Sequence, residues 1–167
     1  SSTALGAFAA NLLYEGDVLK IRPGASNQPA FDTQLDVVTA PQKQLQLQLT
    51  DGSSVKLSSA SALRFPLNFK PNKREVQMSG QAYFEVKPKK NVPFEVKLSN
   101  GVQVKAVGTS FNITSYEAGR MVMTLLTGKV EMSYGDTGVT VNAGEQYEFT
   151  PQYKFRRLKK ADLNQAT

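Results

Sequence analysis

Two glutamates near the middle of the chain, Glu85 and Glu95, are the side chains with the best spacing for acid-base chemistry. They lie in two neighbouring segments of strand-like sequence, and two carboxylates that face one cleft are the catalytic groups of glycoside hydrolases. Glutamates that alternate with apolar residues along a strand more commonly face solvent. We therefore interpret both as surface residues; an enzyme would require their carboxyl groups to share a cleft.

Two further segments are similar in sequence to known kinds of site. Ser110 lies between a turn and a strand in Gly108-Thr109-Ser110-Phe111-Asn112. The segment lacks the Gly-x-Ser-x-Gly spacing, the following helix and the histidine base of a serine nucleophile. The turn Ala143-Gly144-Glu145-Gln146 is similar to a turn of cupins, which hold their metal with histidines. The chain contains no His and no Cys, which removes histidine bases, thiolate nucleophiles and the usual zinc sites. We expect no enzymatic activity, no catalytic residue, no cofactor and no metal.

The net charge of +6 is concentrated at the C-terminal end. Residues 154–167 hold five of the 20 Lys and Arg residues and one of the 14 Asp and Glu residues. A basic run of this kind can bind phosphates or anionic lipid heads, but short runs are weak motifs, and a solvated strand or linker is the ordinary interpretation. We expect no nucleic-acid binding, because the candidate stacking rings occupy core-phase positions of strands. These rings are Phe84, Phe94, Phe111 and Phe149.

No apolar run reaches the roughly 18 to 20 residues that span a bilayer. The nearest, Ala4–Tyr14, has eleven residues and no positively charged segment before it, so it is a poor signal peptide. A chain that begins Ser-Ser-Thr is typical of a trimmed sequence. The lack of cysteine fits both a reducing cytosol and the cell envelope, and it therefore leaves the compartment open.

The elements that position these residues are strands, and the central one is Arg74–Val86. Apolar and polar residues alternate on both sides of Gly80, as they do in a half-buried sheet. We expect two strands here, with a change in the phase of the alternation at Gly80, where a glycine permits a bend or bulge. Phe84 and Val86 are predicted to face the core, and Glu85 to face solvent.

Hairpins surround this stretch at residues 45–57, 96–107 and 130–141. In the first, Leu45, Leu47 and Leu49 form an inward face; in the second, Asn100-Gly101 indicates a type I′ turn. Turns recur every 8 to 20 residues, and helix-compatible composition occurs at residues 159–167 alone. This pattern predicts an all-β fold: a two-layered antiparallel β-sandwich or solenoid-like β-roll with little or no helix.

An ordered series of motifs resembles the periplasmic domain of FecR-type anti-sigma regulators, especially the versions common in Bacteroidetes. The motifs are Asp51-Gly52-Ser53, Leu63-Arg64-Phe65-Pro66, Arg74-x-Val76, Gly80-Gln81-Ala82-Tyr83-Phe84-Glu85-Val86, Pro93-Phe94, Val107-Gly108-Thr109-x-Phe111-Asn112, Thr124-Leu125 through Gly128-Lys129-Val130, and Gly144-Glu145. The resemblance covers residues 39–150. Gln81 replaces the usual glutamate, Ser58-Ser59 a common Leu-Asn pair, and Ala143 the usual proline. These departures affect no chemistry, because the family domain has none.

The resemblance implies a division of the chain. Residues 1–38 would be an N-terminal juxtamembrane-like segment with the first strands, and residues 39–150 the FecR-like β-domain. Residues 151–167 would be a basic C-terminal linker towards a second subdomain that lies outside this chain. That subdomain is similar to the short signalling domain of secretins and TonB receptors.

The resemblance also implies a function. The chain would be the periplasmic sensor domain of a transmembrane anti-sigma factor, tethered to the inner membrane by a helix outside this chain. It would receive a signal from the signalling domain of a TonB-dependent outer-membrane transporter. A cytoplasmic segment, also outside this chain, would bind an extracytoplasmic-function sigma factor. The relay would work by protein contact, for example by strand addition at a sheet edge.

A second hypothesis comes from another class of protein, a secreted carbohydrate-binding or adhesive β-sandwich. Such a module would carry exposed aromatic side chains on one face, and Tyr116 and Tyr147 are the candidates.

Overall fold

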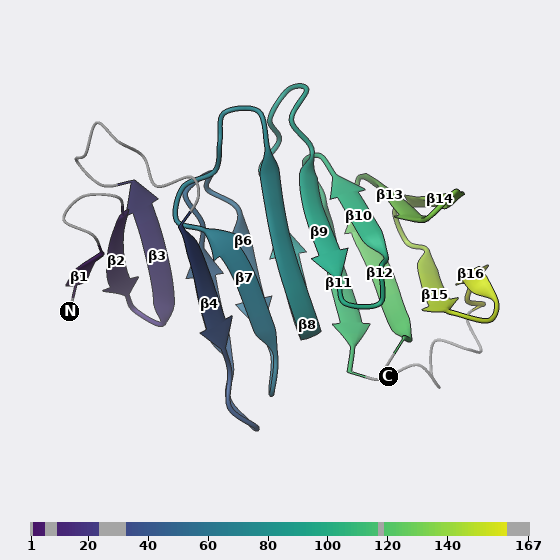
Figure 1. Cartoon of the computed structure of the whole chain (residues 1–167), viewed down its shortest axis with the longest axis horizontal. Helices are drawn as coiled ribbons and strands as arrows, with labels where there is room; N and C mark the ends of the chain where they lie inside the picture. Colours follow the sequence, from purple (N-terminus) through teal and green to yellow (C-terminus); the bar gives the residue numbers. More distant parts are fainter. Residues whose placement is uncertain (1, 6–9, 24–32, 117–118, 160–167) are drawn as a thin grey trace.

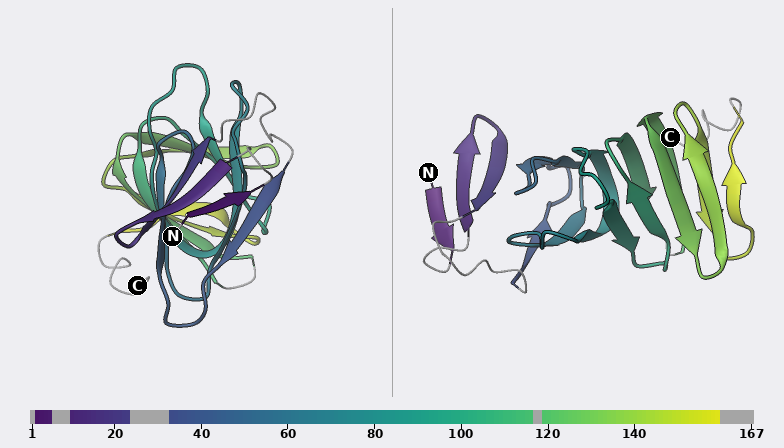
Figure 2. Two further views of the ribbon diagram at one scale, coloured as in Figure 1. Left: turned by 90° about the vertical axis from the view of Figure 1, so that its left-hand side faces the viewer. Right: turned by 90° about the horizontal axis from the view of Figure 1, so that it is seen from above.

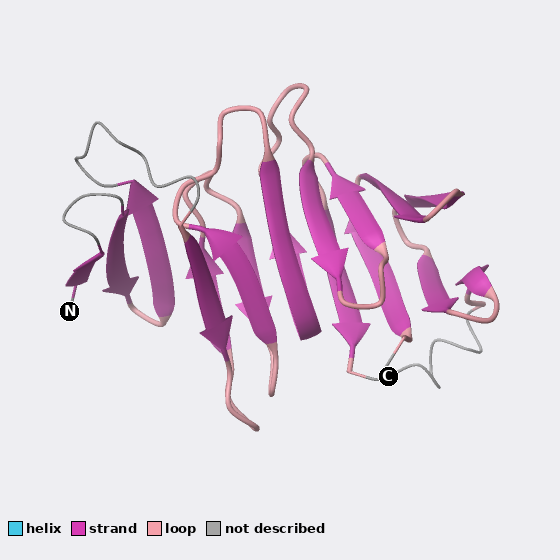
Figure 3. Ribbon diagram, in the orientation of Figure 1, coloured by secondary structure: helices cyan, strands magenta, loops and turns pink. Residues whose placement is uncertain are grey.

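The computed structural model describes residues 2–5, 10–23, 33–116 and 119–159. Within these ranges the chain forms strands and loops and no helix, as Figure 3 shows, so the predicted all-β class is confirmed. It follows that none of the described segments is a long apolar helix of the kind that could cross a membrane. The helix-compatible segment expected at residues 159–167 lies outside the described residues except for Lys159.

The described residues form 16 strands of one continuous mixed sheet (Figure 1). The strands are β1 (Ser2–Leu5), β2 (Ala10–Glu15), β3 (Val18–Pro23), β4 (Gln34–Val38), β5 (Leu45–Gln48), β6 (Ser54–Leu57), β7 (Ala62–Pro66), β8 (Arg74–Glu85), β9 (Phe94–Leu98), β10 (Gln103–Ala106), β11 (Ser110–Ser115), β12 (Met121–Thr127), β13 (Lys129–Tyr134), β14 (Thr137–Asn142), β15 (Gln146–Thr150) and β16 (Lys154–Arg157).

Strand β8 belongs to two layers and joins them. The long layer has the order β1-β2-β3-β5-β6-β8-β11-β12-β15-β16, and the short layer has the order β4-β7-β8-β9-β10-β13-β14. Residues 74–79, the first arm of β8, pair with β7 and β9 in the short layer. Residues 80–85, the second arm, pair with β6 and β11 in the long layer. Figure 2 shows the two layers from the end and from above.

Two of the strand pairs, β3–β5 and β8–β9, are parallel, and the other pairs among the described strands are antiparallel. The sheet is therefore mixed, whereas the sequence predicted an antiparallel one. The difference at β8 follows from the fold: the loop after the second arm leads back to the start of the first arm, so β9 begins beside Arg74 and runs in the same direction.

Gly80 bends β8 without changing its phase. The segment is one strand of 12 residues, and its even-numbered residues are buried from Arg74 through Gly80 to Phe84. The expected phase change is therefore wrong, while the expected bend is present, with Gly80 at φ +87°. Only an inserted residue would reverse the alternation; a bend keeps the same side chains on its inner side, so both arms face one core.

The core lies between the two layers. Phe84 is fully buried, stacks on Phe111 with 5.0 Å between ring centroids, and packs against Phe94 at 6.1 Å. Phe84 and Val86 are buried as predicted, and Glu85 is exposed. The buried cluster is continuous from the early strands to β15, so β8 contributes side chains to its centre.

The Asn100-Gly101 hairpin joins β9 and β10, but its turn is not type I′. Gly101 has φ +94°, whereas Asn100 is not among the residues with positive φ. The Asn100 side chain instead accepts a hydrogen bond from the backbone N–H of Val102 at 2.9 Å. This side-chain bond stabilises a turn in which glycine alone takes the left-handed conformation.

Strands lie on both sides of the two domain boundaries expected at residues 39 and 150. Strand β4 ends at Val38 and pairs with β7, and β16 pairs with β15. The first part of the basic run is therefore an edge strand of the long layer, followed by the buried Leu158.

Candidate functional site

The structure does not bring Glu85 and Glu95 together. Glu85 ends the second arm of β8 and lies on the outer face of the long layer, whereas Glu95 lies on the outer face of the short layer. Two packed sheets are about 10 Å apart, and these carboxylates point away from the core on opposite sides. Glu95 lies 3.9 Å from the ammonium of Lys105. The pair thus lacks the shared cleft that a glycosidase needs.

The serine and the cupin-like turn have structural partners. Ser110 begins β11, and its backbone N–H donates to the Thr127 hydroxyl at 3.0 Å. The Glu145 carboxylate accepts from the backbone N–H of Asn142 at 2.7 Å and pairs with Arg157 at 3.0 Å, so it stabilises its own turn. Among the described residues no group of three Asp or Glu side chains could hold a metal.

The tyrosines of the carbohydrate hypothesis do not form one exposed face. Tyr116 is 51% exposed and donates a hydrogen bond to the Ser59 carbonyl at 2.6 Å. Tyr147 is partly buried and packs against the core cluster. No described feature favours carbohydrate binding over the first hypothesis.

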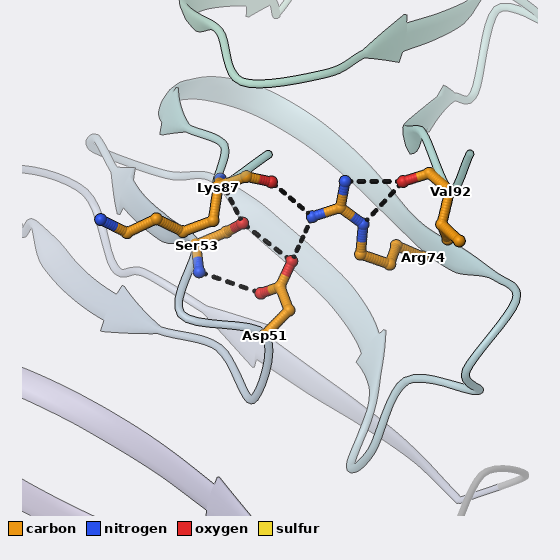
Figure 4. Close-up of polar contacts among 5 residues, drawn as sticks. All are labelled: Asp51, Ser53, Arg74, Lys87 and Val92. Carbon is orange, nitrogen blue, oxygen red and sulfur yellow. Dashed lines mark hydrogen bonds and ion pairs between the residues drawn. The ribbon is translucent and has the colours of Figure 1, made fainter. Parts of the chain in front are cut away.

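Several of the motif residues converge instead at one end of the molecule. Because β8 folds back on itself at Gly80, its first residue and the residues after its last one lie close together. The turn Asp51-Gly52-Ser53 lies beside them, and Figure 4 shows the resulting network of polar contacts. We call this the Arg74 end.

Arg74 is the centre of that network and is 1% exposed. Its Nη1 donates to the Asp51 carboxylate at 2.9 Å and to the carbonyl of Lys87 at 2.7 Å. Its Nε and Nη2 donate to the carbonyl of Val92 at 3.1 and 2.7 Å. The guanidinium also lies 5.6 Å from the centre of the Phe94 ring. A buried cation needs such a complete set of partners, because an uncompensated charge in the core is costly.

Ser53 links the Asp51 carboxylate to the strand that follows. Its backbone N–H and its hydroxyl donate to Asp51 at 3.0 and 2.8 Å, and the hydroxyl accepts from the backbone N–H of Lys87 at 3.0 Å. The turn between β5 and β6 is thereby connected to both arms of β8. Arg74 and Ser53 together hold the chain on either side of residues 87–91.

Residues 87–91, Lys-Pro-Lys-Lys-Asn, form an exposed segment that we call the cationic loop. It is held at both ends by Arg74, through the carbonyls of Lys87 and Val92. The stem of Lys87 lies over the preceding turn, since a Cβ on Gly52 would lie 3.5 Å from the Lys87 Cγ. Pro88 lies closer still to Gly108, where a Cβ would lie 3.2 Å from the proline ring.

A groove of about 510 Å³ opens beside the cationic loop. Thr109 lies in its wall and is 1% exposed, and its hydroxyl has no hydrogen-bond partner among the described residues. Val107, at the rim, is 49% exposed. The full lining is Gln48, Gly52, Ser54, Glu85, Val86, Lys87, Pro88, Val107, Gly108, Thr109 and Ser110.

Charges on the outer face of the short layer are paired with one another. Glu75 lies 3.2 Å from Lys73 and 3.3 Å from Lys97. Partial burial raises the pKa of Glu75, but hydrogen bonds from these two lysines outweigh it and hold the pKa below its ordinary value. The Glu75–Lys97 ion pair therefore connects β8 to β9 on this face.

The opposite end of the sandwich, which we call the Gly80 end, contains hydroxyls in place of charges. The Ser61 hydroxyl accepts from the backbone N–H of Gln81 at 2.8 Å, and the Ser61 N–H donates to the Thr39 hydroxyl at 2.8 Å. A Cβ on Gly80 would lie 2.8 Å from the Cα of Ser61. Close approach and positive φ thus both require glycine here.

The sequence contains a signal for the Arg74 network, which is the alternation along β8 and not a catalytic pattern. Arg74 occupies the same phase as Val76 and Met78, so its position in the alternation is a buried one. A cation in a core phase needs an anionic partner. The identity of that partner, Asp51, depends on the fold-back of β8.

This architecture defines the class of protein as a two-layered β-domain. The family model described as FecR protein matches residues 36–131. The chain belongs to the FecR family, which confirms the resemblance seen in the motifs.

Solved structures agree with this assignment. The fold is similar to two crystal structures, at 2.50 and 1.65 Å resolution, of a candidate anti-sigma factor from Parabacteroides distasonis ATCC 8503. The TM-scores are 0.71 and 0.70, with 26% and 27% sequence identity. The matches cover 80% and 79% of this chain but 64% and 63% of those chains, so this chain spans slightly less than two thirds of their length. A search of curated proteins finds no match.

Proposed function

We propose that this chain is the periplasmic sensor domain of a membrane-anchored anti-sigma factor. In this proposal it relays a signal from a TonB-dependent outer-membrane transporter to an extracytoplasmic-function sigma factor. The observation that carries the proposal is the FecR match over residues 36–131, together with the similarity to structures of a candidate anti-sigma factor. The sigma factor would be bound by a segment outside this chain.

The structure supports a role that works through protein contact. The conspicuous features of the described surface are a cationic loop, a groove and sheet edges, and the two candidate catalytic carboxylates, Glu85 and Glu95, point in opposite directions. A domain of this kind can change the state of a larger protein when a partner binds it, provided that the partner prefers one of the two states.

The test of the relay uses the native full-length protein in its own host with a reporter gene that the sigma factor transcribes. Deleting residues 36–131 should make the reporter insensitive to the substrate of the transporter. Protein abundance, followed by immunoblot, controls for degradation. A reporter that still responds normally to the substrate would contradict the proposal.

The location is tested separately. In spheroplasts, protease added from outside should cleave residues 1–167 while a cytoplasmic marker protein remains intact. Protection of these residues until the inner membrane is lysed would place the domain in the cytoplasm and refute the periplasmic assignment.

A further inference from the structure

The cationic loop carries positive charge that the fold does not neutralise. Lys87, Lys89 and Lys90 are exposed, and no carboxylate of the described residues pairs with their side chains. Three other surface lysines, Lys73, Lys97 and Lys105, each pair with a glutamate instead. The nearby carboxylate of Asp51 is occupied by Arg74. Three cations of this loop therefore remain available to a ligand.

The loop is held in a defined conformation before any ligand binds. Arg74 is fully buried and donates hydrogen bonds to the carbonyl of Lys87, at the start of the loop, and to the carbonyl of Val92, just after its end. Within the loop Asn91 adopts φ +61°, a left-handed conformation that asparagine tolerates better than most residues. Ordering a flexible segment on binding lowers affinity, and a loop that is already ordered avoids that cost.

The groove beside the loop offers apolar contacts, and its lining also contains one carboxylate, that of Glu85. Val107 is half exposed, and the ring of Pro88 lines the same groove, so apolar side chains can pack there. The volume, about 510 Å³, lies within the range of ligand sites.

We propose that the cationic loop and this groove bind an extended acidic segment of a protein partner. The three lysines receive carboxylates, and apolar side chains of the segment pack on Val107 and Pro88. A membrane surface would use the lysines alone and leave the groove empty, which is why the observations favour a peptide. The inference rests on the proposed function in one respect: the partner is the protein that signals to this domain.

The first experiment measures binding of a defined probe to the 167-residue chain. The probe is a fluorescein-labelled ten-residue peptide of alternating Asp and Val, and its control has Asn in place of Asp. We expect fluorescence anisotropy to show at least tenfold tighter binding of the acidic peptide at low salt. Raising the salt should weaken that binding, because screening acts on exposed charges. Equal affinity for the two peptides would overturn the proposal.

Matched variants test the surface. Replacing Lys87, Lys89 and Lys90 with Ser should weaken binding of the acidic peptide at least tenfold. The control replaces Lys43, Lys97 and Lys105 with Ser, which removes the same charge from positions outside the groove and should change affinity less than twofold. If both triple variants lose affinity equally, the peptide responds to net charge alone and the proposal is wrong.

A variant of the groove tests its contribution to binding separately from that of the cationic loop. Val107→Asp places a negative charge in the groove at a half-exposed position, and it should weaken binding of the acidic peptide about tenfold with an unchanged circular dichroism spectrum. Unchanged affinity would remove the groove from the site. Tighter binding of the chain to vesicles of phosphatidylglycerol than to the peptide would identify a lipid surface and refute a peptide site.

The outcomes also distinguish this inference from the relay. Loss of peptide binding in the lysine variant, with a normal response of the reporter, would show a peptide site that does not serve signalling. A normal relay in cells with no peptide binding would leave the proposed function intact and overturn the inference.

Discussion

Arg74 shows how a single buried charge can organise a loop. Its hydrogen-bond partners lie in three separate segments: the turn before β6, the second residue after β8 and the second residue before β9. An apolar side chain in its place would leave the carbonyls of Lys87 and Val92 without this donor and the Asp51 carboxylate without its cationic partner. Removal of one partner from a buried ion pair costs more than the pair contributes, because the other charge stays buried.

We therefore expect Arg74→Met to lower the free energy of unfolding by about 3 to 5 kcal/mol. Urea denaturation followed by circular dichroism measures the change. Arg64→Met is the control, since Arg64 is exposed and its guanidinium lies 3.7 Å from Asp36 in a loose surface pair; we expect an effect within about 0.5 kcal/mol. Equal effects of the two substitutions would show that the Arg74 network does not stabilise the fold.

Gly80 and Gly144 allow strain and crowding to be separated. They have nearly the same φ, +87° and +86°, but a Cβ at Gly80 would approach the backbone of Ser61, whereas a Cβ at Gly144 would meet nothing within 4 Å. In both alanine variants the strain of the left-handed conformation should lower the free energy of unfolding by about 1 to 2 kcal/mol. Gly80→Ala should lose at least about 1 kcal/mol more through overpacking. Thermal and urea denaturation of both variants would test this, and equal losses would contradict it.

The lowered pKa of Glu75 should make the stability of the fold depend slightly on pH. Its pKa in the folded protein is lowered, so its contribution is present above the unfolded value of about 4.5 and is lost as the pH falls through the folded pKa. The group is partly exposed, and the contribution at neutral pH should be under about 1 kcal/mol. The free energies of unfolding of Glu75→Gln and the wild type should be measured from pH 7 to pH 3, and the difference between them should shrink towards zero at low pH. A difference that grows on acidification would refute this account.

At the scale of the elements, β1–β3 form an addition to the sheet and β8 its centre. β3 joins the remainder through a short parallel ladder with β5, and the family match begins after it, at residue 36. Ile21 of β3 is buried and Leu47 of β5 lies in the same cluster. The glutamines of β5 face outward, and they offer weak protection for an edge strand.

Deletion of residues 1–32 should therefore give a folded but less stable domain that tends to associate through β5. We expect a β-type circular dichroism spectrum, a lower melting temperature, and dimers or larger species in size-exclusion chromatography. The full-length 167-residue chain is the control. A deletion variant with no cooperative transition would show that β1–β3 are needed for the fold itself.

At the scale of the whole molecule, one core connects the layers. The buried cluster runs from Ile21 to Phe149 without division, and β8 contributes to both layers. Separate unfolding of one layer would expose the inner face of the other, which is unfavourable because it exposes apolar surface to water. The chain has no Cys that could form a disulfide cross-link.

We expect urea unfolding in a single transition, with the same midpoint by tyrosine fluorescence and by far-ultraviolet circular dichroism. Tyrosine is the natural reporter, because the chain has six Tyr and no Trp. Two transitions, or midpoints that differ between the probes, would show that the layers unfold independently.

Much of the fold could be predicted from local chemistry. Alternation located Arg74–Val86 and the hairpins at residues 45–57, 96–107 and 130–141. Dipeptides such as Asp51-Gly52 and Asn100-Gly101 located turns, and the absence of His and Cys limited the possible chemistry. The motif series by itself indicated the FecR family. These conclusions succeed because a strand's inner face and a turn's conformation depend on residues close together in sequence.

The remaining features were decided by tertiary structure. The fold-back of β8 at Gly80 brings Arg74 beside Asp51 and Lys87, separates Glu85 from Glu95 across the core, and makes β9 parallel to the first arm. None of these relations follows from alternation, because a bend leaves the phase of a strand unchanged while it reverses the direction of the chain. The sequence by itself determined which side chains face inward; the path of β8 determined which of them meet.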